Sequence, residues 1–246
     1  MKKYAITDIG KARTSNQDQA FAYTNNNFDT IGIVCDGMGG HKAGAYASLL
    51  AAKTVLDHFI DVESFETKEE ASKWLYDVIM DANKQVKTKS DNEEKFSGMG
   101  TTLVITLVLS DVVLVANVGD SRVYQCINDE IRQITEDQSL VNILLKSGKI
   151  SDEEALNHPN KHVLMYAVGT MDDPQIDIYE LEKVESSFLM CSDGVYNLVS
   201  QTYLKTIMES SLPISQKAIS IINEANNNGG YDNMAIVLME VNKNGK

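Results

Sequence analysis

The sequence has 246 residues, of which 43% are hydrophobic and 23% charged, a composition typical of a globular protein. Its net charge of −13 speaks against binding to nucleic acid or to an anionic membrane, because both of those partners are themselves negatively charged. The three cysteines are an odd number without metal-ligand spacing, and the chain has neither an apolar leader nor a run of membrane-spanning length, so we expect a cytoplasmic protein with free thiols.

The first half of the chain alternates short β-branched runs with long amphipathic segments. The helix after Thr67 is indicated by the capping-box spacing of Thr67-Lys68-Glu69-Glu70 and by apolar residues that repeat on one helical face from Trp74 to Val86. The other elements predicted here are a strand over residues 30–35, a helix over 43–60, and a hairpin with arms 102–109 and 112–118.

The second half repeats this mixture of hairpins and helices. We predict a hairpin with arms 123–127 and 131–134, strands over 187–191 and 234–241, and helices over 139–147, from 151, over 202–209 and over 215–226. Because the strands come in hairpins and do not alternate one by one with helices, the pattern favours an antiparallel α+β fold over a parallel α/β fold.

Aspartates stand at the ends of the predicted strands, usually beside glycine. They are Asp36 before Gly37, Asp120 after Gly119, Asp193 before Gly194, Asp232 just before the last strand, and Asp18 between two short β-like runs. Carboxylates at neighbouring strand ends can converge on one rim of a sheet, and hard divalent cations such as Mg²⁺ or Mn²⁺ would relieve their repulsion. Two such ions can activate a water for attack on phosphorus. Each Asp-Gly pair can equally be an ordinary turn, so the pattern alone leaves both interpretations open.

Two further residues are candidates for phosphate chemistry. The guanidinium of Arg13 can hold two phosphate oxygens in a fork, although a plain surface arginine fits the same position. His41 follows the glycine-rich turn over residues 37–40 and opens the first long helix. Its imidazole could act as an acid, contact a phosphate, or simply pack at the helix N-terminus.

These motifs occur together, and in the same order, in one known family. From about Thr7 to Val241 the chain resembles the bacterial branch of the type 2C, metal-dependent protein phosphatases. The matching segments are RTSNQD at 13–18, VCDGMGGH at 34–41, GMGTT at 98–102, NVGDSR at 117–122, DQSLV at 137–141 with Glu154-Ala155 and His158-Pro159, SDG at 192–194, and Asp232-Asn233. As a set they are highly specific for that family.

The resemblance implies a fold and a set of roles. The fold is a four-layer α-β-β-α sandwich with two central antiparallel sheets, in a single domain over residues 1–246 with a flap at about 139–163. Arg13, Asp36 and Asp120 are the implied catalytic residues, with Arg13 binding the substrate phosphate. The implied metal ligands are Asp36 as a bridge, Gly37 through its carbonyl, Asp193 and Asp232 at the first ion, Asp18 at the second, and Asp120 with Asp193 at a weaker third.

The function implied is that of a protein serine/threonine phosphatase. It would hydrolyse phosphoserine and phosphothreonine with a water activated by two Mn²⁺ or Mg²⁺ ions, and would oppose a bacterial serine/threonine kinase by acting on that kinase and its substrates. Gln17 stands where many members have Glu, and Met38 where animal relatives have the histidine often assigned as general acid. The carboxylates alone also allow another two-metal phosphohydrolase acting on a small phosphoester, and a non-catalytic domain that keeps the fold.

Overall fold

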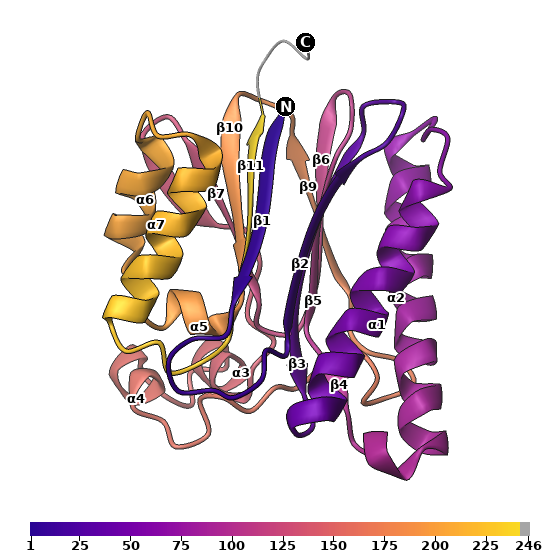
Figure 1. Ribbon diagram of the computed structural model, residues 1–246, viewed down its shortest axis with the longest axis vertical. Helices are drawn as coiled ribbons and strands as arrows, with labels where there is room; N and C mark the ends of the chain where they lie inside the picture. Colours follow the sequence, from indigo (N-terminus) through magenta and orange to yellow (C-terminus); the bar gives the residue numbers. More distant parts are fainter. Residues whose placement is uncertain (242–246) are drawn as a thin grey trace.

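The computed structural model describes residues 1–241, without the side chains of His41 and Leu156. Two β-sheets stand face to face in the middle of the molecule (Figure 1). The first has the order β1 (Lys2–Asp8), β11 (Met234–Val241), β10 (Ser186–Cys191), β7 (Arg122–Ile127) and β8 (Glu130–Gln133). The second has the order β2 (Asp18–Thr24), β3 (Thr30–Met38), β5 (Leu103–Val108), β6 (Val112–Val118) and β9 (Asp177–Glu182), and β4 (Gly100–Thr101) pairs with the end of β3. All these pairings are antiparallel.

Helices cover the outer face of each sheet, which confirms the predicted α+β sandwich (Figure 1). On the second sheet lie α1 (His41–Ile60) and α2 (Lys68–Asn92), and on the first lie α6 (Gln201–Glu209) and α7 (Ile214–Asn227). The shorter helices are η1 (Glu94–Phe96), α3 (Leu140–Lys146), α4 (Asp152–Leu156) and α5 (Asp193–Tyr196). Within residues 1–241, no helix combines the length and the apolar character needed to cross a membrane.

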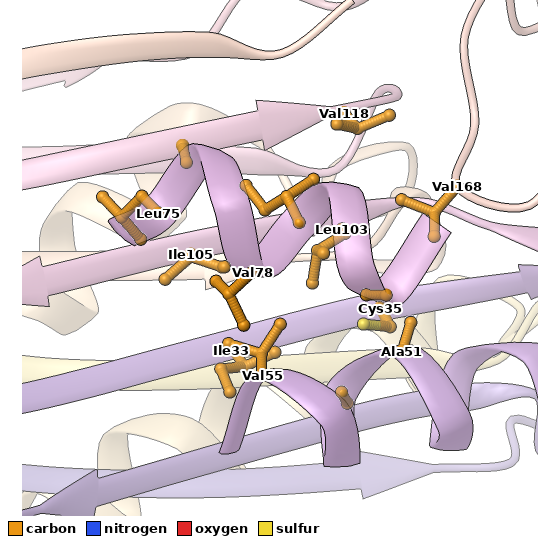
Figure 2. Close-up of a cluster of buried hydrophobic side chains, with 14 of the residues drawn as sticks. Ile33, Cys35, Ala51, Val55, Leu75, Val78, Leu103, Ile105, Val118 and Val168 are labelled. Atoms are coloured by element: carbon orange, nitrogen blue, oxygen red, sulfur yellow. The ribbon is translucent and has the colours of Figure 1, made fainter. Parts of the chain in front are cut away.

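The direction in which β3 side chains point explains how the fold positions the site. Ile33 and Cys35 face Val55 and Ala51 of α1 in the core between helices and sheet (Figure 2). Val34 points the opposite way, into the apolar core between the two sheets. Since side chains alternate along a strand, Asp36 points in the same direction as Val34, at the end of the inter-sheet core.

The structure adds several elements to those predicted, among them β4, η1 and α5, while β2 was noted only as a β-like run beside Asp18. Strands β1 and β9 were not predicted, because neither shows a clear alternation of buried and exposed residues. Asp36 and Gly37 were expected just after a strand but lie within β3, because Asp36 still pairs with Asp18 of β2 and Gly37 with Thr101 of β4. The predicted cap at Thr67 is present, since its side chain accepts a hydrogen bond from the Glu70 amide.

Candidate functional site

Four aspartates gather around Asp36 at one end of the space between the sheets. Asp18 lies directly opposite Asp36 on the neighbouring strand β2. Asp193 is the first residue of α5, and Asp232 stands two residues before β11. Asp120 follows β6 in the turn that leads to β7. The sites predicted at the ends of separate strands are therefore brought together from both sheets.

Hydrogen bonds fix the backbone at Asp36. Its amide donates to Thr102 Oγ1 at 2.9 Å, and its carbonyl accepts from Thr101 Oγ1 and from the Thr102 amide, both also at 2.9 Å. Thr102 Oγ1 in turn shares a hydrogen bond of 2.8 Å with Ser121 Oγ, one residue after Asp120. The segments that carry Asp36 and Asp120 are thus joined through two buried hydroxyls.

Asp18 is joined to the opposite sheet. Ser192 Oγ donates to Asp18 Oδ2 at 2.6 Å and accepts from the Ala235 amide at 2.9 Å. Both Asp18, which is 2% exposed, and Ser192 are buried. Because Ser192 directly precedes Asp193, this one hydroxyl sets the position of Asp18 relative to a second carboxylate of the cluster.

Burial and mutual repulsion raise the pKa values of the aspartates in the cluster. Burial, with the charges of Asp193 and Asp232, raises the pKa of Asp18 to about 8. Burial, followed by the charges of Asp193 and Asp137, raises the pKa of Asp120 to about 7. The pKa of Asp36 is raised well above its ordinary value by burial and then by its four aspartate neighbours. Cations placed in such a cluster would offset both the desolvation cost of the carboxylates and their mutual repulsion.

The donor set fits hard divalent cations. It consists of carboxylate oxygens and backbone carbonyls, which Mg²⁺ and Mn²⁺ prefer. Gly37 has no room for a side chain, since a Cβ would lie 2.1 Å from the Gly44 carbonyl oxygen and 2.7 Å from that of Gln17. In the part of the chain that the structure describes, no three His, Cys, Asp or Glu side chains form a ready-made site for one ion. Asp232 is paired instead with Arg13, whose Nη2 donates to Asp232 Oδ2 at 2.7 Å.

Arg13 therefore lies at the cluster, as its candidate role requires. Its side chain is 46% exposed and that of Asp232 is 37% exposed. An ion pair this accessible to water contributes at most about 1 kcal/mol. The guanidinium can consequently turn from Asp232 to an incoming phosphate at small cost.

The segment predicted as a flap, residues 139–163, carries α3 and α4 beside this end of the molecule (Figure 1). Its two ends are held together, since the Leu140 amide donates to the Val163 carbonyl at 2.9 Å. From it, His162 Nδ1 reaches to 4.0 Å from Asp193 Oδ2. The side chain of His41 is outside the described part of the chain, so its role stays a prediction.

Sequence reasoning named no role for three residues that organise the site. Ser192 and Asn233 each stand next to a predicted ligand, which is the signal that was available, and the structure shows both to be buried. Arg122 forks onto Asp137, with Nε 2.9 Å from Oδ1 and Nη2 2.6 Å from Oδ2, and its guanidinium carbon lies 3.6 Å from the centre of the Tyr196 ring. Nothing in the sequence indicated that stacking.

Comparison with known proteins identifies relatives along the whole chain. The family model described as Protein phosphatase 2C matches residues 10–228. A serine/threonine phosphatase, stp, of Listeria monocytogenes serotype 4b is 40% identical over 235 residues, which cover 95% of this chain and 93% of that protein. The protein phosphatase PhpP of Streptococcus pneumoniae is 34% identical over 239 residues, 97% of this chain and 96% of that protein.

Solved structures agree with these matches. The serine/threonine phosphatase Stp1 of Staphylococcus aureus superposes with a TM-score of 0.91 and 32% identity, over 98% of this chain and 94% of that one. The S. agalactiae serine/threonine phosphatase gives a TM-score of 0.92 and 29% identity, over 98% of this chain and 99% of that one.

Proposed function

This chain belongs to the protein phosphatase 2C family of bacterial serine/threonine phosphatases, and we propose that the aspartate cluster at the end of its two sheets is the catalytic centre. The enzyme is a phosphoric monoester hydrolase that acts on phosphoserine and phosphothreonine. The observation that carries the assignment is the convergence of Asp18, Asp36, Asp120 and Asp193, whose pKa values are raised by burial and by one another's charges, with Asp232 beside them.

The family is generally metal-dependent, and the cluster is where cations would be held. Asp36 would bridge two ions, with the Gly37 carbonyl, Asp193 and Asp232 completing the principal ligands. Asp18 would support the second ion, and Asp120 with Asp193 a weaker third. Bound there, Mn²⁺ or Mg²⁺ would lower the pKa of a water molecule towards neutrality and offset the negative charge of a phosphate.

The protein's own side chains orient the substrate around that centre. Arg13 would take two oxygens of the phosphate in its fork, next to Asp232, and so align the phosphorus with the cluster. Thr101 and Thr102 hold the backbone of Asp36, and so fix the point from which its carboxylate extends into the cluster. The natural substrates proposed are phosphorylated proteins, among them a cognate serine/threonine kinase and that kinase's targets.

The test is phosphate release from a phosphothreonine peptide and from p-nitrophenyl phosphate, with Mn²⁺ and with EDTA. Asp36→Asn should lose at least about 10³-fold in kcat while keeping its fold, because removing the bridging charge weakens both cation positions together. Asp57→Asn, on the exposed face of α1, is the matched control and should behave like the wild type. Retention of half the activity by Asp36→Asn would contradict the assignment. Release from small phosphoesters but not from the peptide would favour the small-molecule phosphohydrolase instead.

A further inference from the structure

Both N–H donors and the carbonyl oxygen of the Asn233 side chain form hydrogen bonds to one loop. Nδ2 donates to the Ile9 carbonyl at 2.9 Å and to the Ser15 carbonyl at 3.0 Å, and Oδ1 accepts from the Gln17 amide at 2.9 Å. The residue is 4% exposed. These three hydrogen bonds hold the buried amide and the loop in one relative position, because breaking any one of them would leave a buried polar group unsatisfied.

The loop held in this way, residues 9–17, carries Arg13 at its centre. Asn233 binds it on both sides of Arg13, at Ile9 before and at Ser15 and Gln17 after. Further bonds join the same two segments, since the amides of Lys11 and Ala12 both donate to the Gly230 carbonyl, at 2.7 and 3.2 Å. The backbone from which Arg13 extends is therefore fixed relative to Asp232, the neighbour of Asn233 in the chain.

We propose that Asn233 is a positioning residue that sets the reach of Arg13 towards the substrate phosphate. The inference rests on the phosphate-binding role of Arg13 in the proposed function. An arginine side chain is long and flexible, so the position of its fork depends on where its backbone is anchored. A displacement of about 1 Å at such a group costs roughly 10²-fold in rate. Only a neutral amide suits this position, because a carboxylate would set its charge against two carbonyl oxygens.

A second asparagine provides a matched control. Asn83, on α2, is 2% exposed and makes the same set of bonds to another loop. Its Oδ1 accepts from the Gly169 amide at 2.6 Å, and its Nδ2 donates to the carbonyls of Met171 at 2.9 Å and Asp172 at 3.3 Å. Asn83→Ala and Asn233→Ala each remove three side-chain hydrogen bonds of a buried amide, so they should lower the free energy of unfolding by similar amounts.

The experiment measures kcat and KM for a phosphothreonine peptide, and the inhibition constant of inorganic phosphate, with Mn²⁺ present. Asn233→Ala should raise KM and the inhibition constant by about tenfold, with a smaller change in kcat, whereas Asn83→Ala should leave both within about twofold. In the Arg13→Ala background, Asn233→Ala should add nothing further to KM, because residues that act through one another are not additive. Asn233→Ser keeps a small, neutral hydrogen-bonding group at this position and serves where the alanine variant does not fold.

Four results would overturn the proposal. An equal rise in KM for Asn83→Ala would show a general effect of destabilisation. Additive effects of Arg13→Ala and Asn233→Ala would show that Asn233 acts on something other than Arg13. A raised KM for Arg13→Ala with an unchanged KM for both Asn233 variants would refute this inference alone, whereas an unchanged KM for Arg13→Ala would refute the role proposed for Arg13 and, with it, the inference.

Discussion

Replacing Asp18 by asparagine should stabilise the protein in EDTA, and increasingly so as the pH rises from 5 to 7. The Asp18 carboxylate is buried among like charges, and its pKa is raised from 3.8 to about 8. Asparagine has the same shape, carries no charge, and its Oδ1 can still accept the hydrogen bond from Ser192 Oγ. The substitution therefore removes the cost of ionising this site while keeping its packing.

The magnitude and its sign follow from proton linkage. Between pH 3.8 and about 8 the folded protein keeps a proton on Asp18 that the unfolded chain has lost. The contribution of Asp18 to the free energy of unfolding is therefore fully present below pH 3.8, the pKa in the unfolded chain. It is lost at about 1.4 kcal/mol per pH unit as the pH rises towards about 8, the pKa in the folded protein. Relative to the wild type, Asp18→Asn should gain about 3 kcal/mol in the free energy of unfolding from pH 5 to pH 7.

The assay is urea denaturation in EDTA at pH 5, 6 and 7, with Asp57→Asn as the control for a lost surface charge. The difference between Asp18→Asn and wild type should widen with pH, while Asp57→Asn should run parallel to the wild type. If the curve for Asp18→Asn also runs parallel to that of the wild type, Asp18 is already ionised at pH 5, and the raised pKa and the stability cost derived from it are refuted. The same variant should lose turnover in Mn²⁺, so stability and activity should change in opposite directions.

Other substitutions test separate parts of the structure. Asp120→Ala should bind one Mn²⁺ fewer than the wild type in calorimetric titration and lose about 10²-fold in kcat; an unchanged stoichiometry would remove Asp120 from the ligand set. Gly37→Ala should cost more than about 2 kcal/mol of stability, because the added Cβ meets two backbone carbonyls that cannot move independently; a thermal midpoint equal to wild type would contradict the crowding. Phe188→Ala, at 0% exposure between the sheets, should lose about 3–5 kcal/mol in urea titration, and a loss below 1 kcal/mol would mean that the two sheets do not depend on it.

The sequence predicted the architecture where the local signals are strong. Hairpin arms with β-branched residues, and helices that begin at a cap such as Thr67 or Ser151, lie within a few residues of their predicted bounds. β1 and β9 carry no comparable signal, because they are edge strands with mixed burial. They are strands because they pair with β11 and β6, respectively. Pairing between segments so far apart in the sequence cannot be predicted from a local pattern of residues.

For the site, residue types at strand ends were enough to nominate the five aspartates, and the structure brings them together. What the sequence could not supply was the set of contacts that fixes them. The bond from Ser192 to Asp18 spans 174 positions, and that from Asn233 to Gln17 spans 216. Nor could it indicate that Arg13 pairs with Asp232, because that depends on how the loop at 9–17 lies against the start of β11.

The pairing of β1 with β11 has a consequence for how activity arises during synthesis. Lys2 lies opposite Glu240 and Asp8 opposite Met234, so the earliest strand to leave the ribosome can pair only after one of the last has been made. The hydrogen bonds of Arg13 with Asp232 and of Asp18 with Ser192 likewise can form only after the later residue of each pair has been synthesised. Since domains assemble as the chain grows, a chain made only as far as β9 has its second sheet and α1 available but still lacks Asp193 and Asp232 of the aspartate cluster. A chain that stops before β11 lacks the strand that lies between β1 and β10, so we expect its first sheet to stay incomplete and the protein to be inactive.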